Sequence, residues 1–140
     1  MKIVPFEITF TVQFSLPCHA IKYTLTHKDI IVEVSERNGT YTDSSGKKYP
    51  GCKSKIAYQQ ITGTSKELIK LSNISIDQWQ AEPYVGELCP GSPGHYITMN
   101  KENKKKEITY SGCNQKFDAN TKMIVNYINT QVPKEYKINL

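Results

Sequence analysis

Alternating apolar and polar residues dominate the first part of the chain. This period of two is typical of a strand with one buried face. Similar patterns predict strands over residues 20–26 and 30–36, and the short polar turns between them predict an antiparallel meander. The first strand contains the apolar series Ile8, Phe10, Val12 and Phe14, which alternates with Glu7, Thr9, Thr11 and Gln13.

A polar segment over residues 37–53 separates the meander from a fourth predicted strand at residues 55–62. The segment is rich in glycine, serine and lysine, so we expect an exposed loop. Residues 66–71 fit either a strand or a helical turn. Two further strands, at residues 95–100 and 107–111, flank a charged turn and predict a hairpin.

Two helices are predicted on one face of this sheet. Ser75 and Gln78 match a capping box, which predicts a short helix that carries Trp79 and ends before Pro83. Asp118 can cap a second helix over residues 119–131, where apolar residues recur at steps of three and four. We therefore expect one α+β domain over residues 1–140, with an antiparallel sheet, a short capped helix and a carboxy-terminal helix.

Charge and composition narrow the possible partners. The net charge is +5, but the cations are seventeen lysines and a single arginine, Arg37. Arginine grips phosphate and guanine bidentately and lysine does not, so we expect no nucleic-acid partner. No apolar run approaches the roughly 20 residues of a membrane helix, so no membrane span is expected. Residues 1–20 have the outline of a secretion signal, but their alternation favours a strand of the folded domain.

The four cysteines predict disulfides and hence an oxidising compartment, because their number is even and each lies in a turn-like segment. A hairpin turn between Asn103 and Lys104 would place His95 opposite Gly112 and bring Cys113 near Cys89. A Cys89–Cys113 bridge would close a loop of about 25 residues and stabilise the fold by roughly 3 kcal/mol. Cys18 and Cys52 are then partners by elimination.

Two chemical alternatives use the same residues. Zinc would need Cys89, His95, Cys113 and either His19 or Cys52, but no closely spaced ligand pair exists. A thiol hydrolase would use Cys89 with His95, which requires the loop between them to fold back. Cys18 and His19 do not form such a pair, because adjacent residues point to opposite faces of a strand. We expect no metal, no cofactor and no catalytic residues.

The segment from Lys106 to the carboxy terminus contains "SGCNQKFDANTKMIVNYINTQVPKEYKI". It resembles the tail of a group of small bacterial envelope and secreted proteins of uncharacterised function, and "LSNISIDQWQ" is similar to their short capped helix. The resemblance covers about half the chain and implies a bacterial protein outside the cytoplasm, periplasmic or secreted, with any signal peptide absent from this chain. It carries no catalytic residues.

These observations favour a non-enzymatic protein-binding module, most concretely an exported immunity protein or inhibitor. Exposed tyrosines make good interface anchors, and lysines beside them imply an acidic partner. The alternative is a module that binds glycans or small molecules in a cleft lined by Trp79, Tyr84 and Tyr96. The residues expected to contact a protein partner are Tyr41, Lys47, Lys48, Tyr49, Tyr84 and His95.

Overall fold

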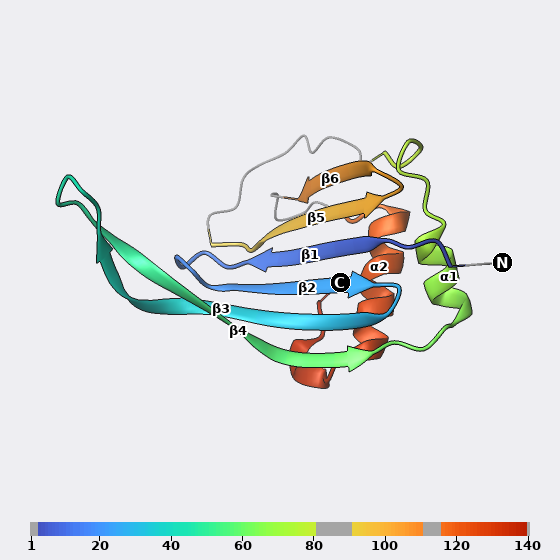
Figure 1. The fold of residues 1–140 in the computed structure, drawn as a ribbon, viewed down its shortest axis with the longest axis horizontal. Coiled ribbons are helices and arrows are strands. Elements are labelled where there is room, and N and C mark those ends of the chain that lie inside the picture. The colour runs from blue at the N-terminus through green and yellow to red at the C-terminus, as the bar shows by residue number, and fades with distance from the viewer. Residues whose placement is uncertain (1–2, 81–90, 111–115, 140) are drawn as a thin grey trace.

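The computed structural model describes residues 3–80, 91–110 and 116–139. It shows a six-stranded antiparallel sheet in the order β4-β3-β2-β1-β5-β6, with helices on one of its faces (Figure 1). This confirms the predicted α+β fold, in which a meander is joined to a hairpin. The elements are β1 (Glu7–Gln13), β2 (Ala20–Thr26), β3 (Asp29–Thr42), β4 (Lys48–Ile61), α1 (Lys66–Ser72), β5 (Gly94–Lys101), β6 (Lys104–Tyr110), α2 (Ala119–Gln131) and a short 3₁₀ helix, η1 (Lys134–Tyr136).

The core lies between the sheet and the two helices. The alternation in β1 places Ile8, Phe10 and Val12 on the helix-covered face, where all three are buried. They face Leu68 and Leu71 of α1 and the apolar stripe of α2, because all belong to one continuous buried cluster. The opposite face of the sheet carries mostly polar residues; we call it the open face.

Helix α2 has the predicted bounds and the predicted cap. The Asp118 side chain accepts a hydrogen bond from the backbone N–H of Thr121 at 2.9 Å, which satisfies one of the free amides of the first turn. The same carboxylate accepts from the Trp79 Nε1–H at 3.1 Å and from the Tyr110 hydroxyl. Burial alone would raise the pKa of Asp118, but hydrogen bonds from Tyr110, Thr121 and Trp79 together lower it.

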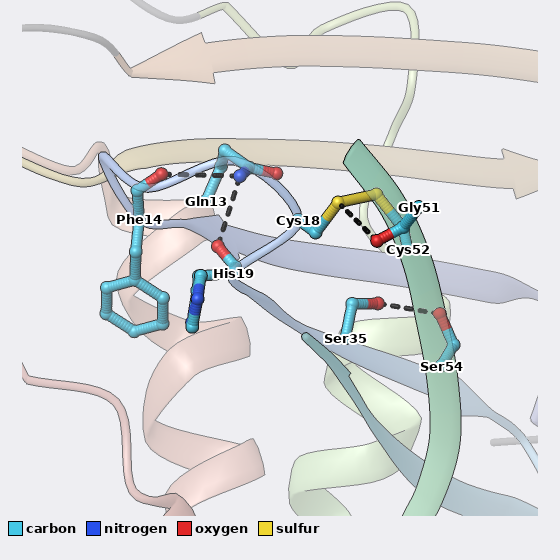
Figure 2. The surroundings of a disulfide bond; sticks show 8 residues. All are labelled: Gln13, Phe14, Cys18, His19, Ser35, Gly51, Cys52 and Ser54. Atoms are coloured by element: carbon cyan, nitrogen blue, oxygen red, sulfur yellow. Dashed lines mark hydrogen bonds between the residues drawn. A yellow bond between two sulfur atoms is a disulfide. The ribbon is translucent and has the colours of Figure 1, made fainter. Parts of the chain in front are cut away.

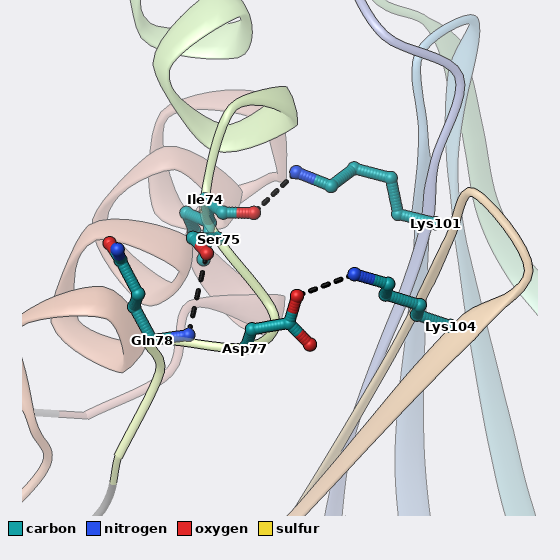
Figure 3. A network of polar contacts seen from close by, with 6 residues as sticks. All are labelled: Ile74, Ser75, Asp77, Gln78, Lys101 and Lys104. Atoms are coloured by element: carbon teal, nitrogen blue, oxygen red, sulfur yellow. Dashed lines mark hydrogen bonds and ion pairs between the residues drawn. The ribbon is translucent and has the colours of Figure 1, made fainter.

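The short helix predicted after Ser75 does not form, and the short helix α1 instead covers the segment that fitted either a strand or a helical turn. Ser65 caps α1 by accepting from the Leu68 N–H at 3.1 Å, whereas the segment after Ser75 forms a single turn. Ser75 does accept from the Gln78 N–H at 3.3 Å, as a capping box requires (Figure 3). The turn does not continue into a helix at Trp79, whose ring is fully buried and bonded to Asp118.

The β5–β6 hairpin has a different register from the predicted one. Lys101 pairs with Lys104, so His95 lies opposite Tyr110 and not opposite Gly112. Glu102 and Asn103 form a two-residue turn with φ values of 52° and 62°, the left-handed pair that matches the twist of the strands. The register on which we based a Cys89–Cys113 bridge is therefore wrong, and both cysteines lie outside the described residues.

Two lysines tie this hairpin to the segment after α1 (Figure 3). The ammonium of Lys101 donates to the carbonyl of Ser72, at 3.0 Å, and to that of Ile74. Lys101 thus satisfies carbonyls at the end of α1, where a cation is also favoured by the helix dipole. Lys104 forms an exposed ion pair with Asp77, which contributes little to stability because water screens it.

Candidate functional site

The segment predicted as a loop, residues 37–53, is mostly a two-stranded ribbon that projects beyond the sheet (Figure 1). Strands β3 and β4 continue well past the ends of their neighbours and keep pairing, with Tyr41 opposite Tyr49 and Thr42 opposite Lys48. We call residues 37–53 the arm. The expectation of exposure is confirmed, since most of these residues are exposed. The expectation of irregular structure is wrong, because backbone pairing overrides the polar composition.

The arm changes direction where the register shifts between Arg37 and Thr40. Gly39 has a φ of 67° there, a left-handed conformation that favours glycine. On the opposite strand Gly51 passes so close to its neighbour that an added Cβ would lie 2.5 Å from the carbonyl oxygen of Asn38. Two glycines on facing strands therefore fix this bend.

The tip of the arm is ordered by one carboxylate. Asp43 Oδ1 accepts hydrogen bonds from the N–H of Ser45 at 2.9 Å, its hydroxyl at 2.6 Å and the N–H of Lys47 at 3.0 Å. These bonds, the one from the Ser45 hydroxyl first, lower the pKa of Asp43. Gly46 closes the turn with a φ of 88°. The tip is therefore a defined structure, held by its own side chain.

One side of the arm presents aromatic rings and a cation. Tyr41 and Tyr49 stack with ring centroids 5.3 Å apart and planes inclined by 22°. The ammonium of Lys47 lies 5.2 Å from the centroid of the Tyr49 ring, within the range of a cation–π contact. Lys48 points to the other side of the ribbon, as its place next to Tyr49 in the strand requires. We call these four residues, which together cover both sides of the ribbon near its tip, the arm surface: Tyr41, Lys47, Lys48 and Tyr49.

A disulfide fastens the base of the arm to the body of the protein (Figure 2). It joins Cys18, in the turn between β1 and β2, to Cys52 in β4, with α-carbons 5.2 Å apart. This confirms the pairing that was reached by elimination. The turn is itself held by Gln13, whose side-chain amide donates to the carbonyls of Phe14 and His19.

The same turn contains two exposed apolar residues that the sequence pattern did not reveal. Phe14 continues the alternation of β1 and was expected to be buried, but it lies beyond the end of the strand and is exposed together with Leu16. The alternation alone misled, but a second signal was present in the sequence, because Pro17, three residues after Phe14, cannot continue a strand. These two residues lie in the turn that the disulfide joins to the arm.

His95 was predicted to contact a partner from a loop, and the structure places it differently. It lies in β5, half-buried, with its ring centroid 5.1 Å from that of Phe117 and 5.8 Å from that of Phe10. Burial among these rings lowers the pKa of His95. Tyr84, which was predicted to contact the partner with His95, and Cys89, which was predicted to form a disulfide, lie outside the described residues.

Two of the three residues proposed for an aromatic cleft, Trp79 and Tyr96, do not come together; the third, Tyr84, lies outside the described residues. Trp79 is 1% exposed and lies in the core on the helix-covered face. Tyr96 is 44% exposed and pairs with Thr11 and Thr109 on the open face, so the sheet separates the two rings. The described residues include no group of three or more His, Cys, Asp or Glu side chains arranged to hold a metal ion.

In the described ranges, no helix has the length and apolar character that crossing a membrane requires. The resemblance of the carboxy-terminal half to bacterial envelope and secreted proteins stays a prediction. The sequence matches no protein-family model, and no curated protein or solved structure matches it either.

Proposed function

We propose that the protein is a non-enzymatic binding module that occupies a partner protein through the arm surface. Its most concrete form is an exported bacterial immunity protein or inhibitor. The observation that carries this proposal is the arm itself, a projecting ribbon with a stacked tyrosine pair and lysines, fastened to the body by a disulfide. The disulfide supports export, because such bonds persist in oxidising compartments.

The arm is suited to binding because it is already ordered. Its tip is closed by the Asp43 hydrogen bonds, its bend by two glycines and its base by Cys18–Cys52. A surface that is ordered before contact loses less conformational entropy on binding, so more of the contact energy appears as affinity. Tyrosine adds a large contact area with few rotatable bonds.

Charge indicates the kind of partner. Residues 37–53 contain four cations, Arg37, Lys47, Lys48 and Lys53, and one anion, Asp43. The difference, 4 − 1, leaves the arm with a net charge of +3, out of +5 for the whole chain. Because the Asp43 carboxylate bonds within the tip, the exposed lysines dominate what a partner meets. We propose that the partner presents an acidic surface, which would also speed association at low salt.

Affinity capture from the source organism's lysate and culture fluid tests this function. The bait is the intact protein, and a recovered partner is then titrated against Lys47→Glu/Lys48→Glu. The matched control is Lys134→Glu/Lys137→Glu, which makes the same change in net charge at exposed positions of η1 and its flank.

We expect the arm variant to weaken binding at least tenfold, and the control variant to bind within about twofold of the native protein. Equal weakening by both variants would show that only net charge matters. Failure to recover any stoichiometric partner in either fraction would contradict the proposal.

A further inference from the structure

The two edges of the sheet differ in how they are protected from pairing with another strand. An edge strand exposes unpaired N–H and C=O groups, and proteins commonly blunt such edges with charges, prolines or short length. At one edge, β6 is seven residues long and carries Lys104, Lys105, Lys106 and Glu107. At the other, β4 is fourteen residues long.

On β4, the charged residues and the proline that hinder pairing with another strand all lie in its first eight residues. Residues 48–55 contain Pro50 and three lysines, whereas residues 56–61, with the sequence IAYQQI, contain no charge and no proline. In the part of the chain that the structure describes, no strand pairs with the outer side of β4. An uncharged, strand-forming segment is thus left open at one edge.

A bulge gives this segment an apolar side. Ile56 and Ile61 are five positions apart in the sequence, so in a regular strand they would point to opposite faces. The register shift opposite Val32 and Glu33 leaves Ala57 unpaired, which turns Ile56 and Ile61 to the same face. Both lie on the open face, and they are 59% and 83% exposed.

The segment is self-complementary. In an antiparallel pair, opposite residues point to the same face, so a strand can pair with its own copy only about a central residue. With Ala57 bulged out, that residue is Gln59. Gln59 then lies opposite its copy, Tyr58 opposite Gln60, and Ile56 opposite Ile61.

We propose that two copies of this chain associate through residues 56–61 of β4, about a two-fold axis at Gln59, into one continuous sheet. The four exposed isoleucines meet in pairs on the open face, which removes apolar surface from water. The two Gln59 side chains can exchange hydrogen bonds. Such isologous contacts are the commonest form of protein oligomer.

A second copy fits this edge better than an unrelated strand, because each residue of the segment then lies opposite a residue of similar polarity from the same segment.

The geometry also limits the length of the contact. One step further, Lys55 would lie opposite Thr62, which is buried and whose N–H already donates to the Lys28 carbonyl. A five-position pair buries less than the roughly 1,600 Å² of a standard interface, so we expect a weak dimer. The contact does not involve the arm surface.

Sedimentation of the full chain tests association from about 5 to about 500 µM, the range suited to a weak dimer. We expect the average mass to rise with concentration toward that of a dimer. Ile61→Lys should weaken the association at least tenfold, because it places a charge at the pairing edge. Tyr96→Lys, on the same open face but on β5, should leave it unchanged. A monomer at every concentration, or equal loss in both variants, would overturn the proposal.

Cross-linking tests the register. Opposite α-carbons in an antiparallel pair are about 4.5–5.5 Å apart, within the roughly 7 Å that a disulfide spans. Gln59→Cys should therefore cross-link to its own copy, and Ile56→Cys to Ile61→Cys in a mixture, with the bonds assigned by peptide mapping. Ile61→Cys alone should not cross-link, because its copy lies four positions away along the pair, about 13 Å at a rise of about 3.3 Å per residue. Efficient cross-linking of Ile61→Cys alone would contradict the register.

Discussion

The disulfide at the base of the arm is expected to be a major contributor to stability. Replacing both Cys18 and Cys52 with serine removes a cross-link between residues 34 positions apart. The loop-closure relation for a loop of this length gives about 4 kcal/mol at 25 °C. The free energy of unfolding of a small domain is about 5–15 kcal/mol. The variant should therefore still fold, but with a much smaller free energy of unfolding.

Urea denaturation measures this loss. The free energy of unfolding of the Cys18→Ser/Cys52→Ser variant should fall by about 3–4 kcal/mol. Reduction tests whether loss of the bond, and not the serine side chains, causes this change. In a Cys89→Ser/Cys113→Ser background, a reductant can act only on the Cys18–Cys52 bond. It should lower the free energy of unfolding by the same amount. Hydrogen exchange should then increase throughout the arm.

A loss below about 1 kcal/mol would refute this reasoning, because it would mean that the cross-link does not restrict the unfolded chain. The intact mass supplies an independent check. In the same background, reduction should add two hydrogens. No change in mass would show that Cys18 and Cys52 are thiols in the folded protein and would remove the support that the bond gives to export.

Three further perturbations test the core, the aromatic cluster and the bend. Asp118→Ala should lower the free energy of unfolding by about 2–4 kcal/mol, since it removes a helix cap and leaves a buried indole N–H without a partner; Asp118→Asn should cost less. The lowered pKa of His95 means that the folded state binds fewer protons than the unfolded state, so stability should fall as pH drops below about 6.5 and level off under the folded-state pKa. Urea midpoints at neutral and mildly acidic pH should show this loss in the native protein and a smaller one in His95→Gln; an identical loss in both would contradict the assignment. Gly51→Ala should distort the arm and speed its hydrogen exchange, whereas Gly63→Ala, with nothing within 4 Å, should not.

The sheet could be predicted from the sequence wherever one face of a strand is buried. Ile8, Phe10 and Val12 mark the first strand without ambiguity because burial imposes the alternation. Helix α2 was equally clear, since its cap and its apolar stripe agree. In these two elements the local sequence pattern and the packing in the folded protein favour the same secondary structure.

Two of the failures have the same physical origin, which is that local sequence signals competed with contacts between residues distant in the sequence. Ser75 and Gln78 match a capping box, and Ser75 accepts the expected hydrogen bond. No helix follows, because the Trp79 indole is buried and donates to Asp118, 39 residues away. In the arm, backbone pairing makes strands out of residues whose polarity predicts a loop. The hairpin register failed for a different, local reason: Glu102 and Asn103 both take left-handed φ values, and of the two only asparagine is a residue that favours this conformation.

The candidate site was predicted in part. Tyr41, Lys47, Lys48 and Tyr49 were selected as exposed residues of one segment, and the structure places them on one ribbon. The stacking of the tyrosines could not be predicted, because it depends on a register that two glycines and a bulge determine. The exposed Ile56 and Ile61 were missed for the same reason, since the bulge at Ala57 brings them to one face.

The central claim is that the arm surface contacts a partner protein, and site-specific photocross-linking tests it most directly. A photoreactive phenylalanine analogue replaces Tyr41 in one protein and Tyr96, an exposed tyrosine on the open face, in another. After irradiation in the source organism's culture fluid and lysate, we expect one protein with an acidic surface to be captured from position 41 and not from position 96. Capture from position 96 alone, or no capture from position 41, would contradict the account.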